Sequence, residues 1–128
     1  MIHTRAMRRP LDRTRYPRDP QSQPISLNLP DGGSVYVQDS IEVIWVLPDG
    51  PHRHVRVLGN AEKAMYASDL TIEHGKIKDV TNLSGSFQFD DPDGLFHIAT
   101  VLERGGFAIE PGGVRLFPMD GSRPIILR

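Results

Sequence analysis

The sequence contains no cysteine, few aromatic residues and no long apolar run. The absence of cysteine excludes a disulfide framework, thiolate zinc sites, iron–sulfur clusters and a cysteine nucleophile. No apolar stretch approaches the roughly 18 residues of a membrane span, and no secretory signal follows the first methionine. We therefore expect a cytoplasmic protein with no membrane partner.

The chain has 128 residues, close to the commonest size of a single domain. Apolar residues make up 38% of it, whereas glycine and proline occupy 12 and 11 positions. This composition disfavours helical bundles and coiled coils and favours short strands joined by turns. We predict a mostly β (α+β) fold: a curled antiparallel sheet or small barrel with one amphipathic helix near residues 92–104.

Charge is distributed unevenly along the chain. Residues 1–20 hold six arginines and two aspartates, a net charge of +4, whereas the other 108 residues have a net charge of −5. Three X-Pro breaks and the lack of a hydrophobic period predict an extended arm over residues 1–24, before one β-rich domain over residues 25–128. Such an arm is either a poorly ordered terminus or a contact for an acidic partner. The partner-binding candidates are its arginines: Arg5, Arg8, Arg9, Arg13, Arg15 and Arg18.

Short apolar segments in the first half predict strands. Residues 25–29 alternate apolar and polar side chains, and a turn at residues 30–33 separates them from a second alternating segment, residues 35–37. This pattern is typical of a hairpin. Residues 41–47 are the most hydrophobic segment and predict the central strand, and residues 55–57 predict another strand.

Two further hairpins are expected in the second half. A two-residue tip at His74 and Gly75 joins residues 70–72 to residues 76–80, because glycine supplies the positive φ of a tight turn. Residues 107–109 and 114–117 bracket a Pro-Gly-Gly turn and predict the last hairpin. Residues 125–127 predict an edge strand, and exposed edges would permit a homodimer.

One helix is predicted between Asp91 and Gly105. Asp91 suits the N-cap, Pro92 suits the first helical position, and Asp93 favours the positive end of the helix dipole. The acidic cluster around Asp91 lacks the alternating ligands of a calcium loop, so we interpret it as a cap. The expected buried stripe consists of Leu95, Ile98, Ala99 and Leu102.

No motif specifies a metal site or a hydrolytic nucleophile. His52 and His54 would share a strand face, but no spacing in the chain specifies a third ligand such as His74 or His97. The serines lack a Gly-x-Ser-x-Gly context, and the glycine pairs lack the lysine of a phosphate-binding loop. We therefore expect neither a metal nor a cofactor.

The loop between the residue 70–80 hairpin and the helix is a candidate binding loop. It contains Ser84, Gly85 and Ser86 and ends in Phe87, so hydroxyl donors, a flexible glycine and an aromatic ring lie together. The alternative interpretation is a plain turn, with Phe87 and Phe89 packed under the helix.

Residues 54–110 resemble a known module. His54, Leu58-Gly59, Ala64, Ala67, the turn at His74-Gly75 and the sequence Ser84-Gly85-Ser86-Phe87 precede an amphipathic helix. This order is similar to the C-terminal module of the plant IQ-motif-containing calmodulin-binding family and its bacterial relatives, where a Ser-Gly-His-Tyr tetrad precedes the helix. The resemblance covers somewhat under half of the chain.

The resemblance implies a pocket near the tetrad. Ser86 and Phe87 stand where the family has histidine and tyrosine, so a group able to transfer protons near neutral pH is replaced by one that is not. Binding is then a better expectation than catalysis. No segment of residues 1–128 matches the calmodulin-binding IQ motif, so calmodulin is not an expected partner. The ligand-binding candidates are His54, Ser84, Gly85, Ser86 and Phe87.

Three functions follow from these observations. The first is a non-catalytic module that binds a small ligand or a protein partner. The second is a small enzyme or toxin-like effector acting on a nucleotide-type ligand, with His54 and Ser84 at its centre and Asp69 or Asp79 as orienting carboxylate. The third, nucleic-acid binding through the arm, is disfavoured by the acidic body.

Overall fold

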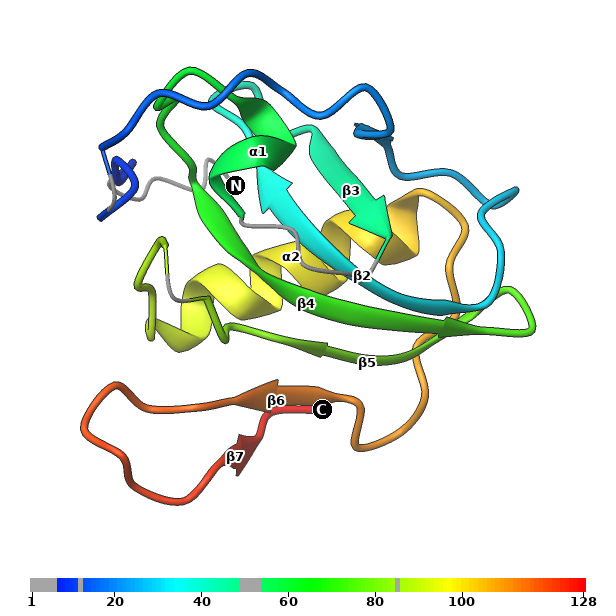
Figure 1. Ribbon diagram of the computed structural model, residues 1–128. Coiled ribbons are helices and arrows are strands. Elements are labelled where there is room, and N and C mark those ends of the chain that lie inside the picture. Colours follow the sequence, from blue (N-terminus) through cyan, green and yellow to red (C-terminus); the bar gives the residue numbers. More distant parts are fainter. Residues whose placement is uncertain (1–6, 12, 49–53, 85) are drawn as a thin grey trace.

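A computed structural model describes residues 7–11, 13–48, 54–84 and 86–128, and its strands form where short apolar segments lie between turn residues (Figure 1). The described residues form seven strands and two helices. The predicted mostly β, α+β fold class is confirmed. The strands are β1 (Gln23–Pro24), β2 (Gly32–Gln38), β3 (Ile44–Pro48), β4 (Tyr66–Glu73), β5 (Lys76–Thr81), β6 (Val114–Leu116) and β7 (Ile125–Ile126); the helices are α1 (Val55–Leu58) and α2 (Pro92–Arg104).

The sheet is mixed and open. Its strand order is β1-β3-β2-β4-β5-β6-β7, and every neighbouring pair is antiparallel except β5 and β6, which are parallel. The chain between β5 and β6 contains α2, as a parallel pair requires a crossover connection. Among the described residues the edge strands β1 and β7 lie at opposite ends of the sheet, so of the two predicted alternatives, a curled sheet or a small barrel, the barrel does not form.

The β4–β5 hairpin forms as predicted. His74 and Gly75 occupy its tip with φ of 54° and 74°, the left-handed conformation that a two-residue turn requires. Glu73 pairs with Lys76, and Leu70 pairs with Val80 across the two strands. Most of β4 is buried, because β2 and β5 flank it on both sides.

Helix α2 also forms as predicted and crosses one face of the sheet (Figure 1). The side chain of Asp91 accepts a hydrogen bond of 2.9 Å from the Gly94 amide, and Pro92 is the first helical residue. The interpretation of the acidic cluster as a cap is therefore confirmed. The predicted stripe is buried in the core: Leu95, Ile98, Ala99 and Leu102.

Two predictions about the first half of the chain are wrong, the first hairpin and the central strand. Residues 25–29 form a turn instead of a strand, with the Leu29 amide donating to Ser26, and β2 pairs instead with β3 and β4. The strand predicted over residues 41–47 begins later, at Ile44, and lies between β2 and the two-residue edge strand β1. The central position belongs to β4, because strand order depends on pairings that hydropathy does not report.

The strand predicted over residues 55–57 is a single helical turn, α1. Val55 and Val57 are both buried, as alternation requires, but two apolar residues two positions apart do not distinguish a strand from one turn of helix. The N-terminal segment, which is the arm predicted over residues 1–24, donates hydrogen bonds to carbonyl groups of α1. The Asp19 amide donates to Arg56, and the Ser22 hydroxyl donates to Val57. These distant partners stabilise the helical conformation.

The last predicted hairpin is also wrong in its pairing. Residues 107–109 and β6 do not pair with each other; both lie beside β5, through a bridge between Ile109 and Ile77 and through the register of Val114 with Val80. Gly113 makes this close approach possible, because a Cβ there would lie 2.6 Å from the Lys78 carbonyl oxygen. The predicted edge strand over residues 125–127 forms as β7.

The described part of the N-terminal segment lies along the body. Arg8 forms a two-bond bridge with Ala64, and the Asn60 amide donates to the Tyr16 carbonyl. Gly59 has a φ of 83°, and a Cβ there would lie 2.3 Å from the Arg18 nitrogen, so the segment passes directly over this glycine. No helix in the described ranges combines the length and the hydropathy needed to cross a membrane.

Candidate functional site

Two predicted ligand-binding residues, His54 and Ser84, line one cavity of about 500 Å³. This volume lies within the roughly 300–1,000 Å³ range of small-molecule sites. The walls combine polar and apolar side chains from the residue before α1, β4, the β5–α2 loop and the β6–β7 loop. The lining residues are His54, Asp69, Leu83, Ser84, Phe117, Pro118, Met119 and Gly121.

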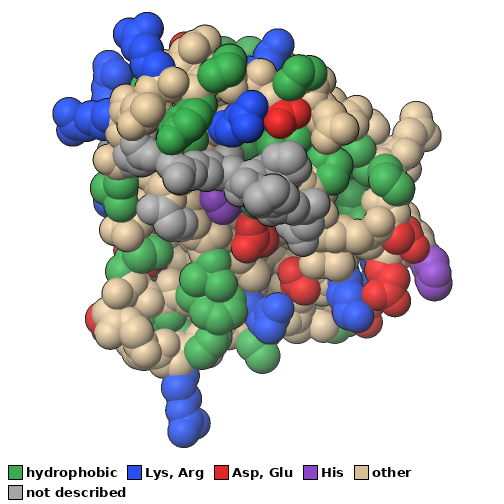
Figure 2. Space-filling model, viewed as in Figure 1, with side chains coloured by type: hydrophobic (Ala, Val, Ile, Leu, Met, Phe, Trp, Pro, Cys, Tyr) green, Lys and Arg blue, Asp and Glu red, His purple; other side chains and the backbone are tan. Residues whose placement is uncertain are grey.

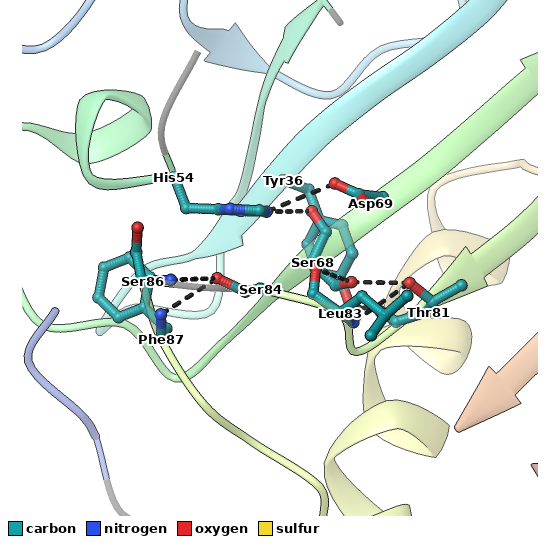
Figure 3. A network of polar contacts seen from close by, with 9 residues as sticks. All are labelled: Tyr36, His54, Ser68, Asp69, Thr81, Leu83, Ser84, Ser86 and Phe87. Atoms are coloured by element: carbon teal, nitrogen blue, oxygen red, sulfur yellow. Dashed lines mark hydrogen bonds and ion pairs between the residues drawn. The ribbon is translucent and has the colours of Figure 1, made fainter. Parts of the chain in front are cut away.

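His54 is held in place by β4 (Figure 3). Its Nε2 lies 2.9 Å from the carbonyl oxygen of Ser68 and 3.5 Å from Oδ1 of Asp69. A carbonyl oxygen accepts and does not donate, so Nε2 carries a proton and donates it to Ser68. The hydrogen bond orients the ring, and the Asp69 carboxylate lies beside it at a longer distance.

A closed set of hydrogen bonds lies beside the cavity (Figure 3). The hydroxyl of Ser68 donates to the Leu83 carbonyl at 2.5 Å, and the Leu83 amide donates to Oγ1 of Thr81 at 3.3 Å. Since Ser68 has one hydroxyl proton, Thr81 is the donor in the 2.7 Å contact between the two hydroxyls. The Thr81 carbonyl accepts from the buried Tyr36 hydroxyl at 2.7 Å, so β2, β4 and β5 are joined.

The loop that begins at Ser84 was predicted to be either a binding loop or a plain turn with packed aromatic rings, and it has features of both. Ser84 Oγ accepts from the amides of Ser86 and Phe87, so this hydroxyl stabilises a turn while lining the cavity. Phe87 and Phe89 are buried in the core, where Phe89 stacks on Tyr66. Ser86 accepts at its carbonyl from the Leu11 amide and is not a lining residue.

The binding candidate Gly85 lies outside the described residues, so its prediction has no structural counterpart. Of the other four candidates, the structure brings His54 and Ser84 together at the cavity. Phe87 contributes to the core instead. Ser84 thus lines the cavity, and Phe87 lies in the core.

The part of the cavity formed by the β6–β7 loop depends on Asn82, which was not predicted as a binding residue. Its fully buried amide donates to the carbonyl groups of Phe89 and Phe117 at 2.7 and 2.8 Å. Its Oδ1 accepts from the Phe117 amide at 2.6 Å. This pairing positions Phe117 and the two lining residues that follow it. No local signal marks the role, because the partners of Asn82 include a residue 35 positions away.

Asp120 stabilises the rim formed by the β6–β7 loop. The hydroxyl and then the amide of Ser122 donate to its carboxylate, and these hydrogen bonds hold the pKa of Asp120 below its ordinary value. The carboxylate is fully exposed, so solvent screens its other interactions. The neighbouring Gly121 lines the cavity.

The other described histidines, His74 and His97, lie apart from this cavity, each near an acidic residue. Nε2 of His74 lies 3.8 Å from Asp31, and Nε2 of His97 lies 3.5 Å from Glu42. His52 lies outside the described residues. In the part of the chain that is described, no group of three or more His, Cys, Asp or Glu side chains could hold a metal ion.

The arginines predicted to bind a partner are distributed along the N-terminal segment, and Figure 2 shows Lys and Arg side chains gathered at the upper left of the molecule. The guanidinium of Arg8 lies 5.5 Å from the Phe89 ring centre, and that of Arg18 lies 4.9 Å from the Trp45 ring centre. Arg9 lines a separate cavity of about 330 Å³. Arg13 and Arg15 are exposed, and Arg5 lies outside the described residues.

Comparison with known proteins gives no match to a family model, to a curated protein or to a solved structure. The resemblance of residues 54–110 to the IQ-motif family therefore stays a prediction. The candidate site depends on the geometry of this chain alone.

Proposed function

We propose that this protein is a non-catalytic module that binds a small ligand in the cavity between His54 and Met119. The observation that carries the proposal is the composition of the cavity. A hydrogen-bonded imidazole, a carboxylate and a hydroxyl line a space of about 500 Å³ together with apolar side chains. Ligand sites typically combine an apolar lining with a few fixed polar groups. A cytoplasmic location remains part of the proposal.

The rigidity of the polar wall supports binding. The Ser68–Thr81–Leu83 hydrogen bonds join neighbouring strands, and they fix the backbone next to Ser84. A polar wall with satisfied internal hydrogen bonds keeps its geometry without a ligand, so little ordering entropy is lost on binding. The same wall positions the Ser68 carbonyl that orients His54.

The small-enzyme alternative has one supporting observation, the short distance between His54 and Asp69. A catalytic arrangement places the carboxylate on one ring nitrogen and the nucleophile on the other. Here Asp69 and the Ser68 carbonyl approach the same nitrogen, and Ser84 Oγ accepts from two backbone amides. The geometry therefore favours binding over turnover.

A fragment screen by NMR tests the proposal. Fragments are expected to shift the amide signals of Ser84, Met119 and Gly121 and to leave those of the β4–β5 hairpin tip unchanged. Met119→Trp should fill the cavity and weaken binding at least tenfold. Met7→Trp is a matched control, since both methionines are 42% exposed but Met7 lines a different cavity.

Three outcomes would contradict the proposal. Binding that persists in Met119→Trp would place the ligand elsewhere. The absence of shifts from any fragment, in a protein that gives a well-dispersed spectrum, would show that the cavity has no binding capacity. Equal weakening by Met7→Trp and Met119→Trp would also reject this site.

A further inference from the structure

One carboxylate dominates the charge of the candidate cavity. Asp69 is the acidic residue of the lining, its side chain is 50% exposed, and the described lining contains neither lysine nor arginine. Asp69 lies on β4, where neighbouring strands fix its backbone in register with Val35. The cavity therefore presents a fixed negative charge to a ligand.

The carboxylate of Asp69 retains acceptor capacity. The Nε2 proton of His54 goes to the Ser68 carbonyl at 2.9 Å, and the 3.5 Å distance to Asp69 exceeds a good hydrogen bond. A carboxylate has about four acceptor positions. By contrast, Asp39 accepts from the amides of Ile41 and Val43 and from the Trp45 indole.

Apolar side chains also line the cavity. Leu83, Phe117 and Met119 offer hydrophobic surface to a ligand that contacts Asp69. The guanidinium of Arg115 lies 5.9 Å from the Phe117 ring centre. Asp79 lies 3.5 Å from that guanidinium and offsets its charge.

These observations select a class of ligand. We propose that the cavity binds an organic cation, an amine that carries an apolar group, with its ammonium on Asp69 and its apolar group on Phe117 and Met119. This inference rests on the proposed function and specifies its ligand. A carboxylate ligand would meet the Asp69 charge, and the lining within the described residues has no lysine or arginine to compensate it, so anions are disfavoured.

Three probes of similar shape test the inference: 2-phenylethylamine, 2-phenylethanol and 3-phenylpropionate. Each is titrated by NMR at low salt and at pH 8, where histidine side chains are ordinarily neutral. The amine should bind about fivefold tighter than the alcohol, as expected for a partly exposed ion pair, and the carboxylate should bind most weakly. Raising the salt concentration should reduce the preference.

Asp69→Asn should remove the preference for the amine and leave alcohol binding unchanged. Glu73→Gln is the control, because it removes one negative charge from the same strand at an exposed ion pair with Lys78, outside this cavity. The amine preference should persist in Glu73→Gln.

The outcomes separate this inference from the function on which it rests. If none of the probes and no other fragment shifts the cavity signals, the binding function itself fails. If all three probes bind equally, or if Asp69→Asn keeps the amine preference, the cation inference fails while the binding function stands. A tighter affinity for 3-phenylpropionate would overturn the assigned charge.

Discussion

The N-terminal segment and the cavity both attracted attention in the sequence, but they use their polar groups differently. In the segment, Arg8 and Arg18 lie over aromatic rings of the body, and backbone groups pair with Ala64 and Asn60. At the cavity, the carboxylate of Asp69 lies half exposed beside an apolar wall. A high local charge is therefore weak evidence for a site. Acceptor capacity directed into a cavity is better evidence.

The largest expected change in the free energy of unfolding comes from Asn82→Ala, which tests whether a buried polar group fixes the cavity wall. Asn82→Ala leaves the Phe117 amide and two carbonyl groups without their partner, and unsatisfied buried groups cost roughly 1–3 kcal/mol each. We expect the free energy of unfolding to fall by about 3 kcal/mol, measured by urea denaturation. Asn28→Ala, at an exposed turn, should change it by less than about 0.5 kcal/mol.

A loss below about 1 kcal/mol in Asn82→Ala would contradict this assignment, because the wall would then be stable without the Asn82 hydrogen bonds. In that case Phe117 would have to be positioned by packing alone. The cavity wall would then be less rigid than its hydrogen bonds indicate.

The next effect tests how closely the N-terminal segment packs on the body. Gly59→Ala adds a Cβ that would lie 2.3 Å from the Arg18 nitrogen, at a φ of 83°. Backbone strain of about 1 kcal/mol and overlap at the lower end of the roughly 1–3 kcal/mol range, about 1 kcal/mol, should together lower the free energy of unfolding by about 2 kcal/mol. Amide signals near Arg18 should shift in the NMR spectrum.

Gly112→Ala separates the two contributions to the Gly59 effect. Gly112 has a φ of 77°, but nothing lies within 4 Å of its added Cβ, so strain is expected without overlap. The Gly112 variant should lose about 1 kcal/mol. Equal losses in the two variants would show that the segment does not pack tightly over Gly59, and it would then become available to an external partner.

The parts of the fold that sequence predicted are those with local signals. The β4–β5 hairpin depends on the turn at His74 and Gly75, and α2 depends on its cap at Asp91. The wrong predictions concern pairings between distant segments: β6 lies parallel to β5, and α1 is stabilised by residues near Asp19. Hydropathy within a short window contains no information about such partners.

The candidate site was predictable to a similar degree. His54 and Ser84 were predicted as binding residues and line one cavity, and Asp69 was considered as a carboxylate beside His54. Phe117 and Met119 were not identified, because their place opposite Ser84 follows from the β6 pairing and from the buried amide of Asn82. An aromatic residue after a strand looks like any core residue in the sequence.

The smallest expected effect concerns the rim of the cavity, where Ser122 hydrogen bonds hold the pKa of Asp120 below its ordinary value. A lowered pKa in the folded state stabilises the fold above the ordinary pKa of aspartate, and this contribution is lost as the pH falls through the folded value. Ser122→Ala removes the hydroxyl donor and keeps the amide, so the Asp120 pKa should rise toward its ordinary value. Side-chain NMR titration measures the change, with Ser40→Ala as an exposed control. An unchanged midpoint would show that the hydroxyl does not bind the carboxylate in solution. The rim would then have a free acceptor at Asp120 near the cavity, and an amine could bind there in competition with Asp69.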